Sequence, residues 1–191
     1  FGVATNVDQT TGDTVNVTNF ENLDASAVNS ALSVIGSVFG NTITTGSGAD
    51  TIDGGGGADI INAGSGNDNV AYYGTENSLD GGAGNNTLAL RTAATVNLGV
   101  SDQTVGDATI VNNFQNVDAS ALSSAVTITG SVTANVITGG SGNDTIDGAG
   151  GADIIAGGLG DDIVTYRGAE TSIDGGAGID TLIGGNDDDT I

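Results

Sequence analysis

The sequence predicts an all-β chain wound into a right-handed parallel β-solenoid of the β-helix or β-roll type. Three observations predict this fold: a period of nine residues, a large aliphatic residue at the eighth place of each repeat, and glycine-rich turns before it. An α-helix repeats every 3.6 residues and a strand every two, so neither explains a period of nine. Stacked coils of short strands and tight turns do.

The repeat is clearest near the carboxyl end, where it reads GGSGNDTID (139–147), GAGGADIIA (148–156) and GGLGDDIVT (157–165). The first six residues predict a turn, and the next three predict a short strand whose middle residue points inward. Two nonapeptides complete one coil, so the chain has room for roughly ten coils. The inward residues are Ile52, Ile61, Val70, Leu79, Leu88, Ile146, Ile155, Val164, Ile173, Leu182 and Ile191.

A longer duplication contains the short repeat. Residues 8–88 align without a gap with residues 102–182, and about 50 of the 81 aligned pairs are identical. We therefore expect two β-solenoid units, 1–94 and 95–191, in one continuous rod. The sequence starts without a signal peptide and ends within a repeat, which indicates a fragment of a longer protein.

Glycine-rich turns occupy only part of each unit, about 36–89 and about 130–191. The remaining stretches, 1–35 and 90–129, predict longer, metal-free coils that continue the same stack. Asp24 and Asp118 each precede a run rich in Ala and Ser, where we expect an N-capped short helical turn.

The composition requires a counter-ion. The formal net charge is −22, from 24 acidic residues against two basic ones, and only three of the acids are glutamates. Aspartate suits tight turns, because its short side chain reaches nearby backbone groups or a hard cation. A three-residue strand buries too little apolar surface to offset the entropy of ordering its coil. We therefore expect metal to supply the missing stability.

The nonapeptide pattern G-G-x-G-x-D-x-U-x, present in about eight copies in one register, resembles the RTX family of calcium-binding proteins secreted by bacterial type I systems. The resemblance implies several Ca²⁺ ions, each held between turns of successive coils by sixth-position carboxylates and loop carbonyls. It places Asp50 and Asp68 on one edge, with the second copy's Asp144, Asp162 and Asp180 on the corresponding edge.

The other edge offers Asp59 and Asp153, flanked by Asn41 and Asn135. Asn86 replaces an aspartate opposite Asp68, which weakens that site. The implied metal set comprises Asp50, Asp59, Asp68, Asp144, Asp153, Asp162, Asp180, Asp189, Asn41, Asn86 and Asn135, with the turn glycines Gly46, Gly48, Gly64, Gly66, Gly140, Gly142, Gly158 and Gly160.

Two repeats, YYGTENSLD (72–80) and YRGAETSID (166–174), carry Asn77 and Thr171 at the sixth place, where we expect weak or no calcium binding. Asp189 lacks a following coil and is expected to bind only in a longer protein. The alternative for every sixth-position aspartate is a metal-free turn-forming role. For the ninth-position residues that role is favoured, as caps of the next turn: Asp53, Asp80, Asp147 and Asp174.

The residue types that the sequence lacks exclude several classes of function. Without His, Cys or Lys, the usual catalytic triads and transition-metal sites are excluded, so we expect no enzyme. The negative charge excludes nucleic acid, and no stretch reaches the roughly 20 apolar residues of a membrane-spanning segment. The prediction is an extracellular or cell-surface bacterial module that binds calcium and folds after export, joined to neighbouring domains of a longer polypeptide.

A second hypothesis remains open. RTX-like arrays accompany polysaccharide-modifying enzymes and adhesins, so the chain is alternatively a carbohydrate-binding or adhesive module for extracellular polysaccharide. Its sugar-stacking platform would comprise Tyr72, Tyr73, Tyr166 and Arg167, which otherwise plug a metal-free turn. The seventh-place residues Ile60, Ile154 and Ile163 are expected to face outward, covered by a neighbour or tolerated singly.

Overall fold

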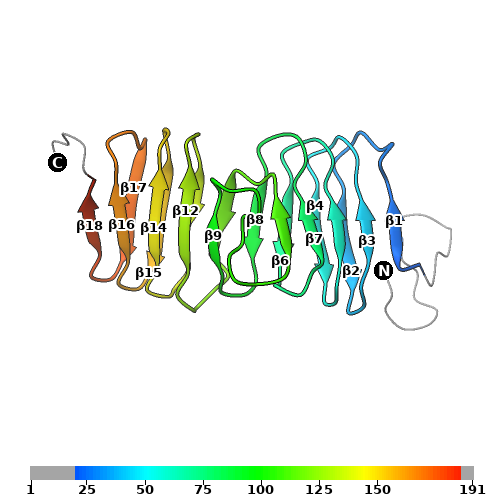
Figure 1. Ribbon diagram of the computed structural model, residues 1–191, viewed down its shortest axis with the longest axis horizontal. Coiled ribbons are helices and arrows are strands. Elements are labelled where there is room, and N and C mark those ends of the chain that lie inside the picture. Colours follow the sequence, from blue (N-terminus) through cyan, green and yellow to red (C-terminus); the bar gives the residue numbers. More distant parts are fainter. Residues whose placement is uncertain (1–19, 186–191) are drawn as a thin grey trace.

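The computed structural model describes residues 20–185, which form 18 strands and no helix. The strands wind into a parallel β-solenoid of about nine turns, which confirms the predicted all-β fold. Figure 1 shows an elongated rod, with β1 (Asn22–Asp24) at one end and β18 (Thr181–Gly184) at the other. The sequence suggested roughly ten coils for all 191 residues, and the described residues form about nine.

One face of the rod is a single eight-stranded sheet, and the opposite face holds two five-stranded sheets. The eight-stranded sheet comprises β2 (Ser33–Ser37), β4 (Thr51–Gly55), β6 (Asn69–Tyr72), β8 (Thr87–Leu90), β11 (Asn116–Asp118), β13 (Val136–Thr138), β15 (Ile154–Leu159) and β17 (Ser172–Ala177). One five-stranded sheet comprises β1, β3 (Thr42–Thr44), β5 (Ile60–Asn62), β7 (Ser78–Asp80) and β10 (Ile110–Asn112). The other comprises β9 (Thr95–Asn97), β12 (Thr127–Ser131), β14 (Thr145–Ala149), β16 (Ile163–Tyr166) and β18.

The core is the predicted ladder of eighth-position side chains. Ile52 pairs in register with Val70, and Ile146 with Val164, so equivalent residues stack from coil to coil. All of those from Ile52 to Val164 are buried, and each contributes about 1.5–3 kcal/mol of burial free energy. Leu182, in the last described strand, is 46% exposed because no described coil covers it.

The seventh-position isoleucines face outward as predicted. Ile60, Ile154 and Ile163 are each exposed, because successive side chains of a strand point to opposite faces of its sheet.

An enlarged coil interrupts the regular winding between the two units. β9 and β10 follow each other in sequence, yet both lie on the face opposite the eight-stranded sheet. Residues 103–105 lie between these two strands and pair with both. Thr104 forms an antiparallel bridge with Val96 of β9, and the Gln103 N–H donates to the Val111 carbonyl of β10 at 2.7 Å. The order on this face is therefore β7, β10, residues 103–105, β9 and β12.

This enlarged coil moves the second unit half a coil around the rod. β4 lies in the eight-stranded sheet, but its counterpart β14 lies on the opposite face. We call turns that lead onto the eight-stranded sheet the first edge and turns that lead away from it the second edge. Asp50 and Asp68 belong to the first edge, whereas Asp144 and Asp162 belong to the second. The expectation that both units use the same edge was wrong, because β9 and β10 share one face.

The coils without glycine turns are longer, as expected. Asn116 and Val136 lie 20 residues apart but share a rung, whereas coils built from nonapeptides repeat every 18 residues. A single turn follows Asp24 and Asp118, at each place where an N-capped short helical turn was expected. Each aspartate accepts a hydrogen bond from the N–H two residues later, at 3.1 Å for Asp24 and 2.9 Å for Asp118, and the stack then continues.

Candidate calcium sites

The sixth-position aspartates form hydrogen-bonded ladders inside the stacked turns. On the first edge, the Asp50 N–H donates to Oδ1 of Asp68, one coil later, at 2.8 Å. On the second edge, the Asp144 N–H donates to Oδ1 of Asp162 at 2.8 Å, and the Asp162 N–H donates to Oδ1 of Asp180 at 3.0 Å. Each turn therefore brings one carboxylate directly against its neighbour's backbone.

Two further aspartates repeat this contact with an asparagine in the preceding coil. The Asn41 N–H donates to Oδ1 of Asp59 at 2.7 Å, and the Asn135 N–H donates to Oδ1 of Asp153 at 2.8 Å. Asp59 belongs to the second edge and Asp153 to the first. Each therefore lies on the edge opposite to the longer aspartate row of its own unit.

The second oxygen of these carboxylates is buried and has no hydrogen-bond partner. Leaving an anionic oxygen buried without a partner costs several kcal/mol, so these atoms require a cation or a proton. Burial accordingly raises the pKa of Asp59, Asp68, Asp153 and Asp162 above the ordinary range. The unpartnered Oδ2 atoms belong to Asp50, Asp59, Asp68, Asp153 and Asp162. In Asp144, this oxygen instead accepts the Gly140 N–H at 2.7 Å.

The turn glycines bring backbone carbonyls into line with the carboxylates. Gly64 has φ +82°, and a Cβ there would lie 2.2 Å from the Gly46 carbonyl oxygen one coil earlier. A Cβ on Gly158, at φ +111°, would lie 2.1 Å from the Gly140 oxygen. Any side chain at these places would separate the coils. Carbonyl oxygens at the second position thus run along the same edge as the sixth-position carboxylates.

The resulting donor set suits calcium. Ca²⁺ takes six to eight oxygen ligands, and carboxylates with backbone carbonyls supply hard oxygens only. Within residues 20–185, no cluster of three or more His, Cys, Asp or Glu side chains is placed to hold a metal. Each site would therefore combine paired carboxylates with turn carbonyls, and the free Oδ2 atoms fit that role.

The sixth-position asparagines already have partners within the protein. Oδ1 of Asn41 accepts the Ser37 N–H at 2.7 Å, and its amide NH₂ donates to the Glu21 carbonyl at 2.6 Å. Asn135 repeats both contacts, with Ser131 and Gln115.

The Asn86 amide bonds to the preceding and the following coil, and its NH₂ also donates to the Gly82 carbonyl of its own turn at 3.4 Å. Its Oδ1 accepts the Asp68 N–H at 3.0 Å, and its NH₂ donates to the Asn113 carbonyl at 3.1 Å. The NH₂ group of Asn86 thus occupies a backbone carbonyl oxygen that could otherwise coordinate a cation.

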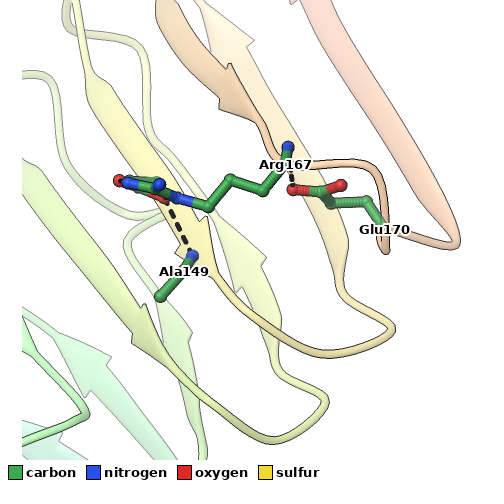
Figure 2. Close-up of polar contacts among 4 residues, drawn as sticks. Ala149, Arg167 and Glu170 are labelled. Carbon is green, nitrogen blue, oxygen red and sulfur yellow. Dashed lines mark hydrogen bonds and ion pairs between the residues drawn. The ribbon is translucent and has the colours of Figure 1, made fainter. Parts of the chain in front are cut away.

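Glutamates close the two repeats that lack the opening glycines, a role that sequence reasoning missed. Glu76 accepts the Tyr73 N–H at 2.7 Å and the Thr75 N–H at 3.0 Å. Glu170 does the same for Arg167 and Ala169, and Figure 2 shows its carboxylate beside the Arg167 backbone. The signal was a Glu at the fifth place of both degenerate repeats.

The second residue of each degenerate repeat reaches back to a ninth-position aspartate. The Tyr73 hydroxyl donates to Oδ2 of Asp53 at 3.1 Å. In the second unit, Arg167 forms a salt bridge with Asp147, and its Nε–Oδ1 distance is 2.8 Å. The Arg167 side chain extends along the coils toward Ala149 in Figure 2. This hydrogen bond lowers the pKa of Asp147.

The ninth-position aspartates cap the following turn. Oδ1 of Asp53 accepts the Gly55 N–H at 2.8 Å, and Oδ1 of Asp147 accepts the Ala149 N–H at 2.9 Å. Asp80 and Asp174 make the same contact. This geometry supports the turn-forming interpretation over metal binding for these four residues.

The tyrosines of the degenerate repeats do not form one exposed platform. Tyr72 is buried in the core, and its hydroxyl donates to Oδ2 of Asp107 at 2.9 Å. Tyr73 and Tyr166 are half-buried. Tyr72 therefore plugs its coil, which is the second interpretation considered above.

A second ladder, at the fifth position, was not anticipated from the sequence. The Asn85 N–H donates to Oδ1 of Asn67, and the Asp161 N–H donates to Oδ1 of Asn143, each at 3.0 Å. These exposed contacts follow the outer rim of the turns. Asp189, by contrast, lies outside the described residues.

Comparison with known proteins agrees with the geometry. The family model of the RTX calcium-binding nonapeptide repeat matches four stretches, residues 35–70, 74–89, 129–164 and 171–191. No curated protein matches the chain. Among the described residues, no helix has the length and apolar character needed to span a membrane.

Proposed function

Because the chain belongs to the RTX calcium-binding nonapeptide-repeat family, we propose that it is a calcium-dependent structural module of a secreted or surface-exposed bacterial protein. RTX repeats bind calcium and are characteristic of secreted bacterial proteins. The observation that carries the proposal is the row of buried, unpartnered carboxylate oxygens inside the stacked turns. Modules of this kind are typically non-catalytic.

The proposed ligands fall into two main rows. Asp50 and Asp68 form the row of the first unit, and Asp144, Asp162 and Asp180 form that of the second. Carbonyl oxygens of the turn glycines complete the coordination shell. A bound calcium ion would thus link two successive coils. The supporting glycines are Gly46, Gly48, Gly64, Gly66, Gly140, Gly142, Gly158 and Gly160.

The remaining sixth-position residues have weaker support. Asp59 and Asp153 have free buried oxygens but no aspartate at the sixth place of the adjoining coils. Asn86 keeps one side of its amide oxygen available, whereas Asn41 and Asn135 are engaged within their own turns.

Folding is expected to follow calcium. Without cations, 24 acidic residues repel one another, and the sixth-position carboxylates would be buried unpaired. The unfolded chain offers no preformed site, so the free energy of calcium binding becomes free energy of folding. We propose that the chain crosses the export machinery unfolded at low cytosolic calcium and folds outside, as a rod that carries neighbouring domains.

Calcium titration followed by far-ultraviolet circular dichroism tests this function. The metal-free chain in chelator should show little β-structure, and a cooperative gain of β signal should appear at roughly 0.1–1 mM calcium. Magnesium at the same concentration is the control, because it prefers rigid octahedral sites with retained water. A spectrum that is the same in chelator and in excess calcium would contradict the proposal.

A further inference from the structure

The two degenerate repeats each place a glutamate beside a sixth-position aspartate of the preceding coil. On the second edge, the Asn77 N–H donates to the Asp59 carbonyl at 2.8 Å, so the turn containing Glu76 stacks directly on that of Asp59. On the first edge, the Thr171 N–H donates to the Asp153 carbonyl at 2.7 Å. The same arrangement therefore occurs once in each unit, on opposite edges.

Both carboxylates of a pair point into the interior of their turns. Oδ2 of Asp59 lies against Gly54, where an added Cβ would be only 2.4 Å from it. The Glu76 carboxylate lies among the backbone N–H groups of its own turn, bonded to Tyr73 and Thr75. The two stacked turns thus each contain a carboxylate in their interior.

The negative charges of these pairs are not compensated within the described chain. Asp59 is fully buried, Glu76 is 4% exposed, and Oδ2 of Asp59 has no hydrogen-bond partner. Asp153 is equally buried, with the same unpartnered oxygen, beside the half-buried Glu170. No described arginine forms a salt bridge with any of the four. Two adjacent buried anions are strongly unfavourable unless a cation joins them.

We infer that Asp59 with Glu76, and Asp153 with Glu170, form two further divalent-cation sites of mixed aspartate–glutamate type. Glutamate takes the place of the missing sixth-position aspartate, with its longer side chain reaching the turn interior from the fifth position. Each Glu oxygen accepts one N–H and retains a lone pair for a hard cation. This inference rests on the proposed function and revises the expectation that the degenerate repeats bind little calcium.

Terbium substituted for calcium provides a local test, because tyrosine sensitises the emission of a nearby Tb³⁺ ion. The chain has three tyrosines and no tryptophan. Tyr72 and Tyr73 open one degenerate repeat and Tyr166 the other. Tyrosine-excited emission should therefore be strong in the wild-type chain loaded with Tb³⁺.

The decisive variant is Glu76→Gln combined with Glu170→Gln, with the exposed Glu21→Gln as the matched control. The double variant should lose two calcium ions per chain by native mass spectrometry and most of its tyrosine-sensitised emission. The control should lose neither. Unchanged ion count and emission in the double variant would show that the glutamates only close their turns, and would overturn the inference.

A second pair of variants covers the case in which the first does not fold. Asp59→Asn with Asp153→Asn leaves both glutamate contacts in place and should also remove two ions and the sensitised emission. Wild-type chain that binds Tb³⁺ but shows no tyrosine-sensitised emission would overturn the inference while leaving the proposed function standing. If neither calcium nor terbium changes the fold, the proposed function itself fails.

Discussion

The backbone N–H of Asp144 donates a 2.8 Å hydrogen bond to Oδ1 of Asp162, 18 residues later and one coil further along the rod. Asp162 makes the same contact with Asp180. Oδ1 of Asp162 thus fixes the spacing of two coils, and its buried Oδ2 has no hydrogen-bond partner. Because Asp162 lies in the middle of its row, we propose that it contributes to calcium sites on both sides.

Asp162→Asn should weaken calcium-dependent folding more than the same substitution at the adjacent Asp161. The amide keeps an oxygen for the Asp144 N–H but removes a charge shared by two sites, so the calcium midpoint should rise about tenfold, or about 1.4 kcal/mol. Calcium titration by circular dichroism measures it. Asp161→Asn is the matched control, because the exposed Asp161 can keep its contact with the Ile179 N–H. Equal midpoints for the two variants would argue against Asp162 as a ligand.

Asn86→Asp should convert the weakened site between the turns of Asp68 and Asn86 into one that calcium fills. The substitution places a carboxylate one coil above Asp68 and removes the NH₂ group that now donates to the Asn113 carbonyl. Native mass spectrometry should detect one additional ion per chain at saturating calcium. The adjacent, exposed Asn85→Asp adds the same charge outside the turn and should leave the count unchanged. An unchanged number of bound ions in Asn86→Asp would mean that the Asn86 amide does not determine whether calcium occupies this site.

Ala149 occupies a backbone conformation that favours glycine. Its φ is +66°, and its counterpart in the first unit is Gly55 at φ +82°. A side chain in the left-handed region costs about 1 kcal/mol or more, so Ala149→Gly should raise the free energy of unfolding by about 1 kcal/mol. Gly55→Ala should lower it by more than that, because an added Cβ would also lie only 2.2 Å from the Ser37 carbonyl oxygen. Urea denaturation at saturating calcium measures both, and shifts of the same sign would contradict the explanation.

Acid should partly replace calcium in the metal-free chain. Burial raises the pKa of Asp59, Asp68, Asp153 and Asp162, so the folded chain binds protons more tightly than the unfolded chain. Proton binding therefore stabilises the folded chain. This contribution is fully present below about pH 3.9, the pKa of an aspartate in the unfolded chain, and it is lost as the pH rises through the raised pKa values of the folded chain. Circular dichroism in chelator should therefore show more β-structure at about pH 4 than at about pH 7.

With calcium present, the dependence on pH should reverse, because protons compete with the ion for the same carboxylates. The calcium midpoint should rise as pH falls. Identical metal-free spectra at both pH values would contradict the assignment of buried, proton-binding aspartates.

Residues in strict nonapeptide register were predictable because local spacing alone places them. Ile61 faces the core, Ile60 faces solvent, and Asp53 caps the next turn, as alternation along a strand and short-range turn chemistry require. The turn capped by Asp24 was predictable in the same way, and it forms a single turn closed by the Val28 N–H and the Ala25 carbonyl. The calcium-binding role expected of the sixth-position aspartates came instead from the resemblance to the RTX family.

The sequence by itself determined the winding, the inward ladder and the aspartates that line the turns, since each depends on a period of nine residues. Tertiary structure alone decided on which edge those aspartates lie. The bridge between Val96 and Thr104 places β9 and β10 on one face, which moves the second unit's aspartate row to the opposite edge. It also brought Glu76 onto the turn of Asp59, a contact set by stacking between coils and therefore absent from any single repeat.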